Sequence, residues 1–82
     1  MEIQTLSDVR AFFERMVAIV GDEWHPDDDY AVYRDRKTKQ PMFLPEEIET
    51  NNRLQAECFA VCEALDEDIY DLGWDVIEKS IV

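Results

Sequence analysis

The strongest constraint on the fold is one apolar stripe near the start of the chain. In residues 5–21, TLSDVRAFFERMVAIVG, apolar side chains recur at intervals of three and four, namely Val9, Phe12, Phe13, Met16, Val17 and Val20. This spacing places them on one face of an α-helix. Thr5 or Ser7 can cap its start, and Asp8 suits the positive end of its dipole. Gly21 suits the position after the last turn. We therefore predict an amphipathic helix that must bury its apolar face.

The length of the chain limits how much can be buried. The 82 residues are 46% apolar, which is too high a fraction for an intrinsically disordered protein. A chain of this size forms one domain and buries only about 60–65% of the surface that the unfolded chain exposes. We expect a single small acidic domain, residues 1–82, with a stability of a few kcal/mol. Binding of a partner or self-association would add to that stability.

Two further helices are predicted in the C-terminal half. A second helix is predicted in residues 44–65, LPEEIETNNRLQAECFAVCEAL, because Pro45 suits the first helical position and the glutamates that follow it favour a helix N-terminus. Residues 66–82, DEDIYDLGWDVIEKSIV, contain a third helical pattern with an apolar arc of about 200°. Because the connection between the two segments is very short, we predict that they form an antiparallel helical hairpin.

The segment between the first two helices is predicted to contain a short two-stranded β-hairpin. Residues 30–33, YAVY, favour a strand, and the turn-forming residues 34–40, RDRKTKQ, follow them. Arg34, Arg36 and Lys37 would then lie at the tip of the hairpin. Two short strands are marginal alone, so the hairpin would have to pack on the helices. The predicted fold class is a mainly helical α+β domain, and the alternative is an all-α three-helix domain.

The charge of the chain narrows the classes of partner. The net charge is −12, which argues against direct binding of nucleic acid or anionic lipid and favours basic partners. Four of the eight basic residues lie in residues 34–39, so an acidic body carries one basic tip. No apolar run approaches the ~20 residues that cross a bilayer. The N-terminus has no apolar secretory signal, and we expect a cytoplasmic protein.

Residues 24–30, WHPDDDY, are the most unusual polar stretch. Three successive carboxylates, Asp27, Asp28 and Asp29, repel one another and attract cations. They do not follow the ligand spacing of an EF-hand loop, whether the loop is begun at Asp22 or at Asp27. We therefore predict no specific metal site. The stretch is interpreted first as an acidic loop and second as a binding site.

Three amides on the second predicted helix are candidates for a polar role. Asn51 and Gln55 fall within the apolar arc of that helix, and Asn52 lies beside them. A buried amide requires hydrogen-bond partners. The amides either line a small polar pocket together with His25, or they bind the loop at residues 24–33.

The two cysteines do not indicate catalysis. Cys58 and Cys62 lie on the apolar stripe of the second helix, where free thiols act as small hydrophobic side chains. Apolar and acidic neighbours raise the pKa of a thiol, which disfavours a nucleophilic pair with His25. A zinc site would need a fourth ligand beyond these three residues. We predict no enzyme, no cofactor and no metal site.

The third helix supplies the remaining candidate surface. Its wide apolar arc includes Tyr70 and Trp74, which either pack centrally or stay exposed for a partner or a second copy. The leading hypothesis is a non-enzymatic protein that binds a protein partner or self-associates, as a homodimer through this helix. The contact residues would be the aspartates at 27–29, Tyr70, Trp74, and Arg34, Arg36 and Lys37 of the basic tip. The alternatives are an acidic inhibitor that mimics nucleic acid, and a binder of divalent ions or small ligands at residues 27–29.

Overall fold

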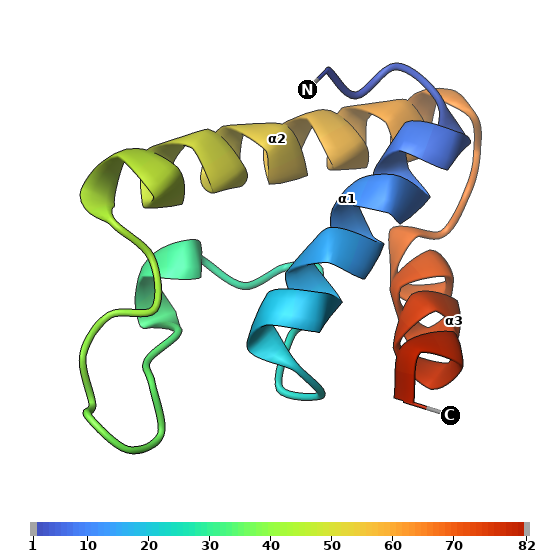
Figure 1. Ribbon diagram of the computed structural model, residues 1–82. Coiled ribbons are helices and arrows are strands. Elements are labelled where there is room, and N and C mark those ends of the chain that lie inside the picture. Colours follow the sequence, from blue (N-terminus) through green and yellow to red (C-terminus); the bar gives the residue numbers. More distant parts are fainter. Residues whose placement is uncertain (1, 82) are drawn as a thin grey trace.

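Three α-helices and one 3-10 turn form the fold in a computed structural model, which describes residues 2–81. The elements are α1 (Leu6–Val20), η1 (Tyr30–Val32), α2 (Pro45–Ala64) and α3 (Ile69–Ile81). In Figure 1, α2 runs across the top of the molecule, and α1 and α3 descend from it. The most extensive contact between helices joins α1 to α3. Within the described residues, no helix is long and apolar enough to cross a bilayer.

The N-terminal helix has the boundaries that its sequence predicts. The Thr5 hydroxyl accepts a hydrogen bond from the Asp8 amide at 3.1 Å, and the Asp8 carboxylate accepts one from the Thr5 amide at 3.1 Å. This reciprocal capping box satisfies two amides at the helix start. Gly21 ends the helix with a φ of 91°, a conformation that favours glycine, and its amide donates to the Val17 carbonyl at 2.8 Å. The prediction for this segment is confirmed.

The predicted β-hairpin is wrong, and so is the α+β class. Among the described residues, the only β-pairing is an isolated antiparallel bridge between Arg34 and Pro41. Two hydrogen bonds flank this pair, from the Met42 amide to the Tyr33 carbonyl at 3.0 Å and from the Asp35 amide to the Gln40 carbonyl at 2.9 Å, and the pairing does not continue into a ladder. Tyr30–Val32 forms a 3-10 turn instead of a strand, because the Asp29 carboxylate accepts from the Ala31 amide at 2.9 Å and caps the turn. The observed class is the all-α three-helix alternative.

The predicted antiparallel pairing of the last two helices is also wrong. In Figure 1, α3 turns away from α2 and descends beside α1. Asp66 makes this reversal in the left-handed region, with a φ of 55°, and Glu67 donates to the Cys62 carbonyl at 2.9 Å. Ile69, Val76 and Ile77 of α3 are consequently buried in the common core. The short connection correctly indicates a sharp turn between α2 and α3. The direction of that turn is set by the apolar face of α1, against which α3 packs.

The core is largely aromatic, and the loop between α1 and α2 contributes to it directly. Trp24 and Tyr30 are fully buried. Val20, Phe59 and Leu72 pack against the core but are only partly buried, and Leu65 at the end of α2 is 52% exposed. The buried apolar residues are Ile3, Val9, Phe12, Phe13, Met16, Val17, Trp24, Tyr30, Tyr33, Phe43, Leu54, Cys58, Cys62, Ile69, Val76 and Ile77.

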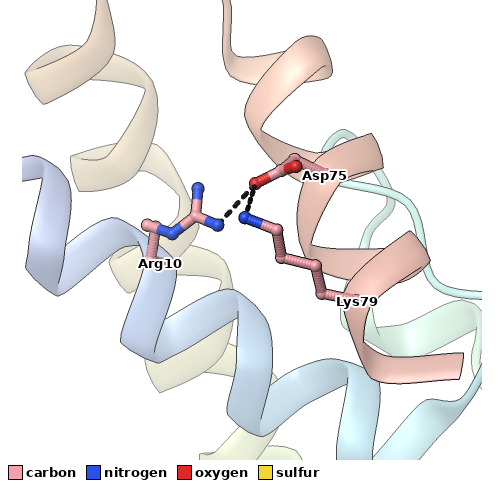
Figure 2. A network of polar contacts seen from close by, with 3 residues as sticks. All are labelled: Arg10, Asp75 and Lys79. Carbon is pink, nitrogen blue, oxygen red and sulfur yellow. Dashed lines mark hydrogen bonds and ion pairs between the residues drawn. The ribbon is translucent and has the colours of Figure 1, made fainter. Parts of the chain in front are cut away.

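A charged network joins α1 to α3 at the edge of their contact (Figure 2). Arg10 of α1 donates a hydrogen bond to the Asp75 carboxylate of α3, and the Lys79 ammonium lies 3.1 Å from the same oxygen. These two hydrogen bonds hold the pKa of Asp75 below its ordinary value. Because the side chains are 31–69% exposed, the network stabilises the domain little.

Candidate functional site

The acidic loop at residues 22–29 is positioned by two buried aromatic side chains. The Trp24 indole N–H donates to the Tyr30 hydroxyl at 3.0 Å. The Trp24 ring packs against Phe13 of α1, with ring centroids 4.7 Å apart. Burial raises the pKa of Tyr30, so its hydroxyl stays protonated at physiological pH. The loop is thus attached to the core on both sides of its aspartates.

Two amides of α2 hold the other side of this loop. Asn52 accepts a hydrogen bond from the Tyr30 amide at 3.0 Å and donates one to the Asp29 carboxylate at 2.9 Å. The Gln55 side-chain nitrogen donates to the Asp28 carbonyl at 2.6 Å. These contacts are the loop binding that the sequence offered as one of two interpretations.

The third amide, Asn51, lies away from the loop. It is buried on the α1 side of α2 and lines a separate pocket of about 380 Å³. Arg15 of α1 and Glu46 and Glu47 of α2 bring both signs of charge to this pocket. His25, which the sequence grouped with the three amides, has an exposed side chain, and only its backbone amide donates, to the Tyr33 hydroxyl at 3.2 Å.

The three aspartates differ in how their carboxylates are used. One Asp28 oxygen accepts from the Tyr33 hydroxyl at 2.9 Å. One Asp29 oxygen accepts from the Ala31 amide and from Asn52, and these hydrogen bonds hold the pKa of Asp29 below its ordinary value. Within the described part of the chain, Asp27 makes no side-chain hydrogen bond. Asp27 is therefore the aspartate least committed to the fold.

The first of two neighbouring pockets lies between the loop and α2, and we call it the α2 pocket. Its volume is about 290 Å³, and it is lined by the three aspartates of the loop and by Asn52, Gln55, Ala56 and Phe59 of α2. Gln55 is only 7% exposed, and its side-chain oxygen is buried without a hydrogen-bond partner. Buried polar atoms normally have a hydrogen-bond partner, so the Gln55 oxygen is an exception among the side chains that line this pocket.

The second pocket, the α3 pocket, lies between the same loop and α3. It measures about 200 Å³ and is lined by His25, Pro26, Asp27, Tyr70, Trp74 and Ile77. The side chains of Tyr70 and Trp74 are 48% and 57% exposed. The His25 and Trp74 rings meet edge to face, with centroids 6.5 Å apart.

A glycine of α3 allows the loop to form this pocket. A Cβ atom at Gly73 would lie 3.1 Å from Cγ of the buried Pro26, which is tighter than ordinary packing. The absence of a side chain at Gly73 therefore lets the loop lie directly on α3. The sequence contained both residues, but nothing in their spacing indicated that they meet.

The two pockets form one continuous surface. Asp27 lines both of them, and Phe59 of the α2 pocket meets Tyr70 of the α3 pocket edge to face, with centroids 6.2 Å apart. We call the combined area the aromatic–acidic surface. The structure thus brings together two candidates that the sequence offered separately, the aspartates at 27–29 and the Tyr70–Trp74 pair.

The basic tip is not part of this surface. In Figure 1 the tip occupies the loop that hangs below η1, at the end of the molecule away from α3. Arg36 lies 2.9 Å from Glu23 and 3.6 Å from Asp22, and Arg34 donates to the Lys39 carbonyl at 3.3 Å. Lys37 is exposed. The tip thus neutralises part of the protein's own acidic loop.

The two cysteines are free and buried, as the sequence predicts. Burial raises the pKa of Cys58 to about 12, and burial also raises the pKa of Cys62. Both thiols therefore stay protonated and weakly nucleophilic at neutral pH. Among the residues the structure describes, no group of three or more His, Cys, Asp and Glu side chains is arranged to hold a metal ion.

No family model, curated protein or solved structure matches the chain. The chemistry of the aromatic–acidic surface is consequently the basis for inferring a function. Exposed aromatic rings bury apolar groups and bind cations through their faces. The carboxylates beside them attract positive charge. The arrangement is suited to a ligand that carries both apolar and cationic groups.

Proposed function

We propose that this protein is a binding module for a basic, amphipathic segment of a protein partner, which it holds on the aromatic–acidic surface. The observation that carries the proposal is Trp74, which is 57% exposed beside a pocket of about 200 Å³. Trp24, by contrast, is fully buried. Tryptophan and tyrosine are enriched among the residues that contribute most to protein interfaces.

The charge around Trp74 favours a basic partner. Asp71 and Glu78 lie three residues before and four residues after Trp74 and are exposed, so they share its side of α3. Asp27 adds a carboxylate from the loop side of the pocket that Trp74 lines. In a chain with a net charge of −12, this setting accelerates the encounter with a basic segment and disfavours an acidic one.

The two kinds of side chain on such a segment would have different sites. An aliphatic or aromatic side chain would enter the α3 pocket, between Pro26, Trp74 and Ile77. Lysine or arginine side chains would lie toward the aspartates. Apolar burial would then supply most of the affinity, and the charges would supply specificity and speed of association.

Selection from a library of random short peptides tests the proposal. The wild type and a Trp74→Ala variant are used as parallel targets, and Val32→Ala is the matched control because Val32 is a 61% exposed apolar residue on η1. Peptides enriched by the wild type and by Val32→Ala should carry net positive charge and one large apolar residue. They should not be enriched by Trp74→Ala. Circular dichroism checks that both variants fold.

Two results would overturn the proposal. One is enrichment that is equal on the wild type and on Trp74→Ala. The other is a set of selected peptides without net positive charge. Analytical sedimentation of the wild type and of Trp74→Ala tests whether the chain forms a dimer through this surface instead. A dimer that depends on Trp74 would make the occupant of the surface another copy of the chain rather than a basic segment.

A further inference from the structure

We infer that the α2 pocket receives the guanidinium group of an arginine on the bound segment. This inference rests on the proposed function and specifies the chemistry of one contact within it. It is carried by the buried, unpartnered oxygen of Gln55 together with the carboxylates that line the same pocket.

The α2 pocket offers unused hydrogen-bond acceptors. The Asp27 carboxylate, Oδ1 of Asp28 and Oδ2 of Asp29 have no hydrogen-bond partner within the described residues, and all three side chains line the pocket. None of the lining residues is cationic. A pocket with several free acceptors and negative charge selects a cation that has many donors.

Gln55 indicates that the missing group is a donor. Its side-chain nitrogen is committed to the Asp28 carbonyl at 2.6 Å, so the amide cannot rotate to exchange its ends without losing this bond. Its oxygen therefore stays an acceptor in a residue that is only 7% exposed. An unsatisfied buried acceptor is costly, and a bound N–H group removes that cost.

The shape and chemistry of the pocket favour guanidinium over ammonium. A guanidinium group is planar and points five N–H donors outward in its plane, so it can reach acceptors on different residues together. Its flat face stacks on aromatic rings, and the ring of Phe59 lines this pocket. An ammonium group has three donors and is more strongly hydrated. A divalent ion would need converging carboxylates, whereas Asp28 and Asp29 are partly committed to Tyr33, Ala31 and Asn52.

Side-chain amide signals in nuclear magnetic resonance spectra give a direct test. The ¹⁵N-labelled protein is titrated with N-acetyl-arginine N-methylamide, and separately with the matching lysine and citrulline compounds. The arginine compound should shift the Gln55 side-chain signals in a saturable manner. The lysine compound should bind more weakly, and the neutral citrulline compound should produce no saturable shift.

Two charge-removing variants separate a specific contact from general attraction. Asp27→Asn removes the uncommitted carboxylate and leaves the structural hydrogen bonds of the loop in place. Glu14→Gln removes the same charge from an exposed position on α1 outside the pocket. Asp27→Asn should weaken binding of the arginine compound about fivefold, the upper range for an exposed ion pair, and Glu14→Gln less than about twofold.

The inference is overturned if the Gln55 signals do not respond, if citrulline binds as well as arginine, or if both variants weaken binding equally. Tighter binding of free arginine than of the blocked compound would identify a free small ligand and would also overturn the assignment to a partner's side chain. If the arginine compound does not shift the Gln55 side-chain signals, and selected peptides still require Trp74, only this inference fails. If the arginine compound binds but no Trp74-dependent peptide is selected, the proposed function fails.

Discussion

Replacement of Asn52 by alanine tests whether the helix amides hold the acidic loop. Asn52 is the residue through which α2 contacts both the backbone and a side chain of the loop, by its bonds to the Tyr30 amide at 3.0 Å and to Asp29 at 2.9 Å. The Asn52→Ala variant loses both bonds. It also leaves the Tyr30 amide without its acceptor in a partly buried position.

The structure sets the size of the expected effect. An intramolecular hydrogen bond contributes about 0.5–1.5 kcal/mol net, and an unpaired buried donor costs about 1–3 kcal/mol. The bond to Asp29 is exposed, so water replaces it and its share is small. The loss at the Tyr30 amide dominates, and alanine recovers about 0.5 kcal/mol through its helix propensity. We expect Asn52→Ala to lower the free energy of unfolding by about 0.5–2.5 kcal/mol.

Urea unfolding followed by circular dichroism measures this change. The control is Arg53→Ala, which alters the neighbouring exposed residue and should stay within about 0.5 kcal/mol of the wild type. In a domain of this size, the loss in Asn52→Ala corresponds to a fall in Tm on the order of 10 °C. A change in Asn52→Ala no larger than that in Arg53→Ala would show that the Asn52 hydrogen bonds do not stabilise the loop.

Three further predictions concern stability. Tyr30→Phe leaves the buried Trp24 indole N–H without an acceptor and should cost about 1–3 kcal/mol in urea unfolding; no loss would contradict the hydrogen bond seen at 3.0 Å. Leu44→Ser should add about 0.5–1 kcal/mol, because Leu44 is the 59% exposed N-cap of α2 and serine would complete the capping box begun by Glu47; an unchanged Tm would contradict this. The folded pKa of Cys58, about 12, exceeds the unfolded value of about 8.5, so its contribution to stability is full below pH ~8.5 and is lost as pH rises toward 12. Urea unfolding at several pH values should show a smaller alkaline loss in Cys58→Val than in the wild type, and equal losses would exclude this origin.

Local patterns were sufficient to predict the N-terminal helix but not the segment that follows it. The apolar spacing of α1 and its capping residues are encoded within 17 residues, from 5 to 21. Residues 30–33 have strong β propensity, but the Asp29 cap and the burial of the Tyr30 and Tyr33 rings favour a 3-10 turn. Tertiary packing therefore outweighs the β propensity of residues 30–33, as it often does for short segments.

The candidate site was predictable in its parts but not in its assembly. The aspartates, the amides and the Tyr70–Trp74 pair are visible in the sequence as residues of the right type. Their assembly depends on contacts between distant residues, such as Pro26 against Gly73 and Phe59 against Tyr70. The turn of α3 toward α1, which presents Trp74 beside the loop, likewise depends on the packing of three elements. No spacing rule within one segment contains that information.

Binding at the aromatic–acidic surface is tested most directly by a ¹H–¹⁵N titration of the protein with a basic amphipathic peptide selected on the wild type. The two tryptophans supply indole signals at the surface and in the core, because Trp74 is 57% exposed and Trp24 is fully buried. We predict that the Trp74 indole and the Gln55 side-chain amide shift together along one saturating curve, while the Trp24 indole does not move. Saturable shifts confined to the basic tip or to α1, with Trp74 unchanged, would exclude binding at the aromatic–acidic surface.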